Sequence, residues 1–66
     1  MANSKMIDIS VYIRSKKEKA TRVEPVYSTR NSAWLPNSQI ELAPTKATDI
    51  WTLTLPEWLA VEKGLV

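Results

Sequence analysis

Two stretches in which an apolar side chain recurs at every second position constrain the fold of this chain more than any other feature. They cover residues 6–13 and 49–55. A period of two with many β-branched residues is typical of half-buried strands. The faces expected to point inward carry Ile7, Ile9, Val11 and Ile13 in the first stretch and Trp51, Leu53 and Leu55 in the second. Met6, Asp8, Ser10 and Tyr12 form the outward face of the first stretch.

Three shorter extended segments are predicted between these strands. They are Ala20–Glu24, Ala33–Leu35 and Ile40–Leu42. The first of them ends at Pro25 or continues through Val26 and Tyr27. Polar turns are predicted at 14–19, 28–32, 36–39 and 44–48. A strand every ten residues or so leaves no room for crossover helices, so neighbouring strands must be antiparallel. We expect a mainly β fold, a small, strongly twisted antiparallel sheet or partial barrel of the SH3-like or OB-like kind.

The end of the chain changes period and predicts a short helix. Pro56 suits its first position, and Glu57 in the first turn and Lys63 at the end complement the helix dipole. Gly64 suits the left-handed position after the helix, so that Leu65 folds back on the last turn.

A helix of two turns is not stable alone and must dock on the sheet. We expect docking through Leu59 and either Trp58 or Val61. Trp51 and Trp58 are both expected in the interior, because each tryptophan buries a large apolar area.

The residue types present in the chain exclude several kinds of catalytic and metal site. The chain has 66 residues, no Cys and no His, which predicts a single domain over 1–66 with a flexible N-terminal segment at 1–5. Disulfides, thiolate metal sites and histidine-based nucleophiles are excluded within the chain. The seven acidic residues share no motif spacing, so we expect no enzyme, no cofactor and no metal site. Neither a membrane span nor a secretory signal is apparent, which favours the bacterial cytoplasm.

Positive charge is concentrated between residues 14 and 22. Five basic residues stand there against Glu18, a local charge of +4 in a chain whose net charge is +2. This cluster is interpreted as a solvated hairpin tip, a contact for an acidic protein face, or a contact for nucleic-acid phosphates. Single-strand binders also need stacking aromatics, for which Tyr12 and Tyr27 are the nearest candidates.

The segment Trp34-Leu35-Pro36-Asn37-Ser38-Gln39 predicts a strand that ends in one 3₁₀ turn, with Asn37 or Ser38 bonded to nearby backbone. Trp34 and Leu35 are interpreted as core residues, or Trp34 as part of a peptide groove. Thr52 and Thr54 are a candidate edge for strand addition or dimerisation. The partner-binding candidates are Arg14, Lys16, Lys17, Lys19, Arg22, Tyr12, Tyr27 and Trp34.

Two blocks of the sequence carry a resemblance. Residues 34–41, WLPNSQIE, are similar to a W-L-P-K-S-Q-I-E block, and residues 54–65, TLPEWLAVEKGL, are similar to a closing T-[IL]-P-E-W-L-A-x-x-K-G-L block. Glu18-Lys19-Ala20 resembles the E-K-A before the second strand of such proteins. The chain thus resembles small proteins of bacteriophages, prophages and mobile elements that have no assigned activity. It departs from them at Asn37, where Lys is usual, and in a longer polar insert at 25–32.

Taken together, these features predict a non-enzymatic protein that acts by occupying a surface. The first hypothesis, which the resemblance implies, is a phage-type accessory protein that binds a host or phage protein, such as an anti-CRISPR-like inhibitor of a host defence system. The alternatives are a small nucleic-acid-binding module that uses the basic hairpin, and a structural subunit of a larger assembly, with a homodimer as one form.

Overall fold

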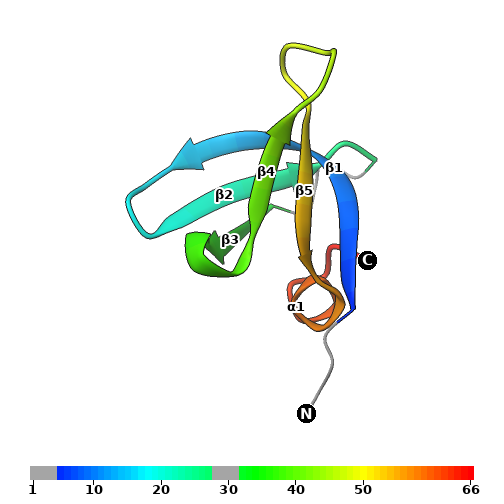
Figure 1. Ribbon diagram of the computed structural model, residues 1–66. Coiled ribbons are helices and arrows are strands. Elements are labelled where there is room, and N and C mark those ends of the chain that lie inside the picture. Colours follow the sequence, from blue (N-terminus) through cyan, green and yellow to red (C-terminus); the bar gives the residue numbers. More distant parts are fainter. Residues whose placement is uncertain (1–4, 28–31) are drawn as a thin grey trace.

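The computed structural model describes residues 5–27 and 32–66. Its elements are β1 (Met6–Lys16), β2 (Ala20–Pro25), β3 (Ala33–Pro36), a 3₁₀ turn (Asn37–Gln39), β4 (Glu41–Pro44), β5 (Trp51–Pro56) and helix α1 (Glu57–Glu62). The strands form one sheet in the order β3-β2-β1-β5-β4, and every neighbouring pair is antiparallel (Figure 1). The predicted mainly β fold, a small twisted antiparallel sheet with a C-terminal helix, is therefore confirmed. The sheet is not closed, because β3 and β4 are its edges.

Strand β1 joins the two halves of the sheet and is longer than the sequence indicates. It pairs with β5 from Met6 to Val11 and with β2 from Val11 to Lys16, and it curves between the two halves (Figure 1). A bulge lies between Ile13 and Ser15, a feature that bends a strand and increases its twist. The prediction of a turn at 14–19 was wrong for its first three residues, because pairing with β2 holds them in the strand.

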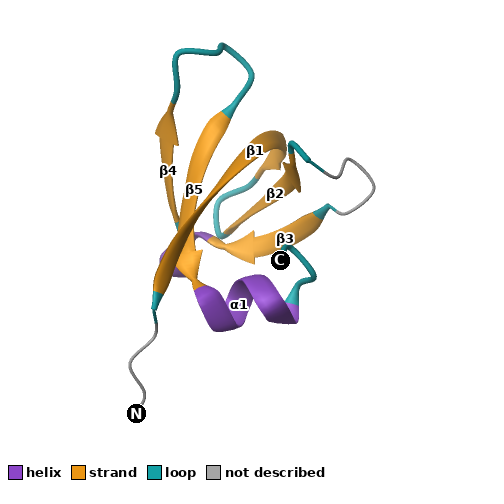
Figure 2. Ribbon diagram, turned by 90° about the vertical axis from the view of Figure 1, so that its right-hand side faces the viewer, coloured by secondary structure: helices purple, strands orange, loops and turns teal. Residues whose placement is uncertain are grey.

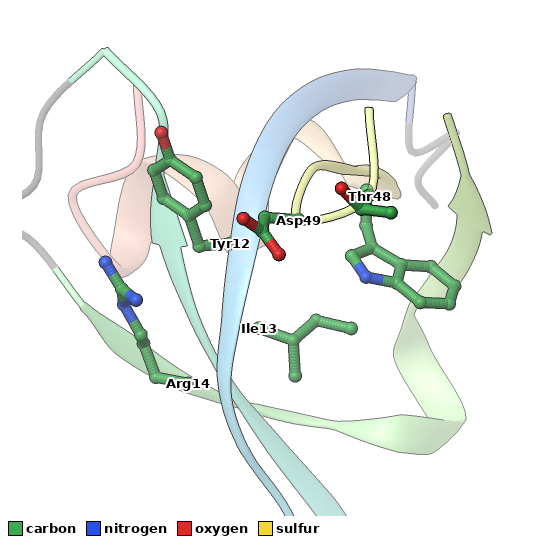
Figure 3. Close-up of a pocket in the computed structure, with 6 residues that line it drawn as sticks. Tyr12, Ile13, Arg14, Thr48 and Asp49 are labelled. Carbon is green, nitrogen blue, oxygen red and sulfur yellow. The ribbon is translucent and has the colours of Figure 1, made fainter. Parts of the chain in front are cut away.

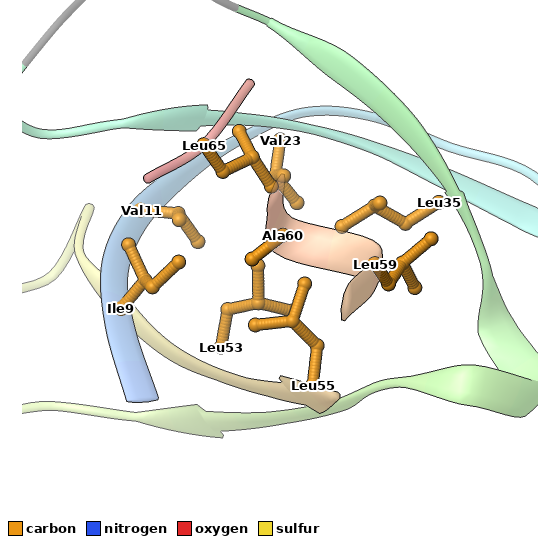
Figure 4. Packing of buried hydrophobic residues seen from close by; sticks show 9 residues of the cluster. All are labelled: Ile9, Val11, Val23, Leu35, Leu53, Leu55, Leu59, Ala60 and Leu65. Carbon is orange, nitrogen blue, oxygen red and sulfur yellow. The ribbon is translucent and has the colours of Figure 1, made fainter. Parts of the chain in front are cut away.

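The core lies between the curved sheet and α1, which covers one of its faces (Figure 2). The buried apolar residues are Ile9, Val11, Val23, Leu35, Leu53, Leu55, Leu59, Ala60 and Leu65, which point toward one another (Figure 4). Most of the predicted inward residues of β1 and β5 are thus confirmed. Ile7 and Trp51 are only partly buried against this cluster, and Ile13 is partly exposed.

Helix α1 docks through different residues from those expected. Leu59 and Ala60 are buried, whereas Trp58 is 50% exposed and Val61 is 60% exposed. Successive helical residues are rotated by about 100°, so with 59 and 60 facing the sheet, 58 and 61 must face away from it. The prediction for Leu59 is confirmed, and the interior placement of Trp58 was wrong.

The two ends of α1 follow from local sequence. Pro56 closes β5 in an extended conformation (φ −63°, ψ 140°), so the helix begins at Glu57, one residue later than predicted. At the other end Gly64 has φ 73°. The Leu65 N–H donates to the Ala60 carbonyl at 2.8 Å, and the Gly64 N–H donates to the Val61 carbonyl at 3.1 Å. These two bonds make the Schellman motif that the Gly-Leu pair predicts.

The threonines of β5 are not an edge. Strand β5 lies between β1 and β4, so the candidate edge at Thr52 and Thr54 was wrong. The Thr54 hydroxyl instead donates to Asp8 Oδ1 on β1 at 2.6 Å. The predictions for 1–4 and for the loop at 28–31 lie outside the described residues.

Candidate functional site

The face of β1, β2 and β3 that points away from the core brings two aromatic rings together. On β2, Thr21, Val23 and Pro25 are buried, so the alternate residues Arg22 and Glu24 point the other way. Arg22 lies directly opposite Trp34 of β3, and Glu24 lies opposite Tyr12 of β1. Because paired residues share a face, Tyr12 and Trp34 lie on the same outer surface.

A cation accompanies each ring. The Arg14 guanidinium carbon is 4.9 Å from the centroid of the Tyr12 ring, and Lys17 Nζ is 5.9 Å from that of Trp34. Each such contact contributes about 0.5–1 kcal/mol at an exposed site. Arg22 lies beside Trp34. We call Tyr12, Arg14, Lys17, Arg22 and Trp34 the basic-aromatic face.

Two of these cations are held in place by neighbours. Arg14 donates from Nε to Glu24 Oε1 at 2.6 Å, and its Nη2 lies 2.6 Å from the same oxygen. Arg22 donates to the Ser32 hydroxyl from Nε at 3.1 Å and from Nη2 at 3.0 Å. Arg14 is partly neutralised by its ion pair with Glu24. Arg22 and Lys17 have no ion pair with another described residue, so they are the cations on this face that are available to an anion.

Trp34 occupies this surface because adjacent residues of a strand point to opposite faces. Leu35 is fully buried, whereas Trp34 is 42% exposed. The interpretation of both residues as core was therefore wrong for Trp34. The strand assignment alone could have shown that only one of the two can face inward.

The other three candidate residues lie elsewhere. Lys16 is opposite the buried Thr21, so it points to the other side of the sheet at the end of β1. Lys19 lies in the turn between β1 and β2, beside Pro36 and Ser38. Tyr27 is 66% exposed in the turn that follows β2. It lies beyond the C-terminal end of β2, whereas Lys17 lies before the N-terminal end of that strand. The structure thus brings together five of the eight predicted residues.

Asn37 fixes the turn that presents Lys17. Its backbone N–H donates to the Lys19 carbonyl at 2.9 Å, and its Nδ2 donates to the carbonyls of Lys17 at 3.1 Å and Glu18 at 3.0 Å. Its Oδ1 accepts a 2.6 Å bond from the hydroxyl of the buried Thr21. The predicted 3₁₀ turn with a bonded Asn37 is confirmed, and its partners belong to the neighbouring hairpin. Sequence reasoning missed this positioning role because those partners are 16 to 20 residues away.

A second exposed surface lies on α1. Trp58 and Val61 are three residues apart and therefore adjacent on its outer side. Glu57 and Glu62 are exposed and flank them around the helix. This surface is apolar at its centre and acidic at its rim, the opposite charge to the basic-aromatic face. We call these four residues the α1 patch.

These surfaces offer aromatic rings and charged side chains to a ligand. Within residues 5–27 and 32–66, no group of three acidic side chains gathers closely enough to hold a metal ion. In the same part of the chain, no helix has the length and apolar character needed to cross a membrane. Aromatic rings on an outer surface with cations nearby accept planar groups and anions.

Comparisons with protein-family models, with curated protein sequences and with solved structures find no match to this chain. The resemblance to phage proteins therefore stays a prediction.

Proposed function

We propose that this protein binds single-stranded nucleic acid on the basic-aromatic face. One observation carries the proposal, namely two aromatic rings on one outer sheet surface, each with a cation beside it. Single-strand binders combine positive charge that follows the phosphates with aromatic rings on which bases stack.

The spacing of the rings suits two separate bases. Tyr12 and Trp34 are about 12 Å apart, because they are two strand spacings apart across the sheet and two residues apart along it. Stacking contributes about 1–3 kcal/mol per base. In a duplex the bases already stack on one another, so the rings gain little from it. The arrangement therefore favours a single strand over a duplex.

Fluorescence anisotropy with a labelled single strand of about 15 nucleotides, near the upper site size of a small domain, tests the proposal. Lys17 and Arg22 are the cations of this face expected at phosphates. The affinity should then fall with salt with a logarithmic slope of about −1.4, at roughly −0.7 per contact. Trp34→Ala should weaken binding about tenfold, the loss of one stacked base.

The double variant Lys17→Gln, Arg22→Gln should bring this slope close to zero, because it removes both expected phosphate contacts. The matched control is Lys5→Gln, Lys63→Gln, which removes the same charge at the α1 end of the sheet and should leave the slope unchanged. The proposal would be contradicted if the two double variants changed the salt slope equally, or if the wild type did not bind the oligonucleotide at low salt.

A second candidate function, recognition of a protein partner, is favoured by the α1 patch. A half-exposed tryptophan next to an exposed valine is the kind of anchor that carries binding energy at protein interfaces. The acidic rim suits a partner with basic residues around an apolar pocket. The resemblance to phage proteins supports the version in which this partner belongs to a host defence system.

Pull-down from a bacterial host lysate tests this second function. A specific protein captured by the wild type and lost with Trp58→Ala would support it, with Trp34→Ala as the matched control on the other surface. A partner that survives Trp58→Ala but not Trp34→Ala would instead assign protein binding to the basic-aromatic face, and capture of nothing would remove this candidate.

A further inference from the structure

A small cavity adjoins the basic-aromatic face where β1 leaves β5. It has a volume of about 240 Å³ and is lined by Tyr12, Ile13, Arg14, Thr48, Asp49 and Trp51. Figure 3 shows Tyr12 and Arg14 on one side of β1 and Ile13 and Thr48 on the other, with the Asp49 side chain across the strand in this view. The cavity thus continues from the ring of Tyr12 around the edge of β1 to the loop before β5.

The walls of the cavity combine the apolar side chains of Ile13 and Trp51 with the polar side chains of Thr48 and Asp49. Ile13 and Trp51 are partly buried and provide flat and apolar contacts. The carboxylate of Asp49 is exposed and makes no hydrogen bond or ion pair with another residue of the described segments. The Thr48 hydroxyl lies beside it in sequence and in the cavity wall.

The edge of β1 next to the cavity also has backbone groups that no described strand pairs with. Pairing between β1 and β5 ends at Val11 with Trp51, whereas β1 continues to Lys16 and pairs only with β2 among the described residues. The N–H and C=O groups on the other edge of β1, from Tyr12 onward, are therefore not used by the described sheet. They are available to a planar polar ligand in the cavity.

Asp49 determines which part of a nucleotide fits its side of the cavity, because the other charged lining residue, Arg14, is ion-paired with Glu24. A carboxylate repels a phosphate but accepts hydrogen bonds from amino groups, and carboxylate side chains recognise the cytosine amino group in this way. Thymine and uracil have a carbonyl oxygen at that position and would face Asp49 with an unpaired acceptor.

We propose that this cavity is a base-reading pocket, in which Asp49 accepts a hydrogen bond from the exocyclic amino group of a base whose neighbour stacks on Tyr12. The inference rests on the proposed function and adds base preference to it. Cytosine is the base that tests it most directly, because it differs from thymine mainly at this amino group and at the thymine methyl group.

The experiment compares oligo-dC with oligo-dT of about 15 nucleotides by anisotropy. The wild type should bind oligo-dC about tenfold more tightly. Asp49→Ala should bring the ratio of the two affinities to about one while both oligonucleotides still bind. Asp49→Asn should also lower the ratio, because an amide can donate to the thymine carbonyl as well as accept from cytosine.

Glu62→Ala is the matched control, since it makes the same charge change on α1 and should leave the ratio unaltered. Equal binding of both oligonucleotides by the wild type would overturn the pocket and leave the proposed function standing. A preference for oligo-dC that persists in Asp49→Ala would also overturn it. Binding of neither oligonucleotide would overturn the proposed function together with the inference.

Discussion

Replacing Asn37 with Ala should destabilise the protein strongly, although this residue is only partly buried. The substitution removes three side-chain hydrogen bonds, two to the carbonyls of the β1–β2 turn and one from the buried Thr21 hydroxyl. Each contributes about 0.5–1.5 kcal/mol net, so we expect a loss of about 3 kcal/mol. A chain of this size has about 3–10 kcal/mol in total.

The loss is measured by urea unfolding followed by circular dichroism, and it should also lower Tm by on the order of 15 °C. Ser38→Ala is the matched control, because Ser38 is exposed and its side chain makes no hydrogen bond with another described residue. Asn37→Lys should lose less than Asn37→Ala, since an ammonium can still donate to the two carbonyls but cannot accept from Thr21. A free energy of unfolding for Asn37→Ala within about 0.5 kcal/mol of the wild type would refute the account of this turn.

Three further outcomes follow from the same contacts. Glu24→Gln releases Arg14 from its ion pair, so the salt dependence of nucleic-acid binding should steepen by about 0.7, which is measured by anisotropy against Glu62→Gln as control. Gly64→Ala should lower the free energy of unfolding by about 1 kcal/mol, because φ is 73° and an added Cβ meets nothing within 4 Å, so backbone strain is the only cost. Leu59→Ala should cost about 2–5 kcal/mol in the same urea titration, and a smaller loss would mean that α1 is weakly docked.

Much of the fold was predictable because its signals are local. Alternation in 6–13 and 49–55 identified the two central strands, and Gly64-Leu65 identified the end of the helix. The outward direction of Trp58 was not predicted, because a helix of six residues has too few apolar positions to show which side docks. The extension of β1 through Lys16 was not predicted either, because its charges match a turn and only pairing with β2 makes it a strand.

The candidate site was predictable in composition but not in arrangement. The excess of charge at 14–22 lies on the β1–β2 hairpin, which carries Tyr12, Arg14, Lys17 and Arg22 of the basic-aromatic face. Lys17 and Arg22 lie on one face of the sheet and Lys16 on the other. This division of the charges depends on the bulge after Ile13, which shifts the register between β1 and β2. Asp49 and Trp51 reach the edge of this face only because β1 bends away from β5, a tertiary feature without a sequence signal.

The most direct test of nucleic-acid binding is an NMR titration of the ¹⁵N-labelled protein that follows the tryptophan indole N–H signals. Trp34 lies on the basic-aromatic face, Trp51 lines the adjoining cavity, and Trp58 is on the α1 patch. On addition of a cytosine-containing single strand, the signals of Trp34 and Trp51 should shift and that of Trp58 should stay in place. A shift confined to Trp58, or no shift in any of the three at saturating oligonucleotide, would contradict the account.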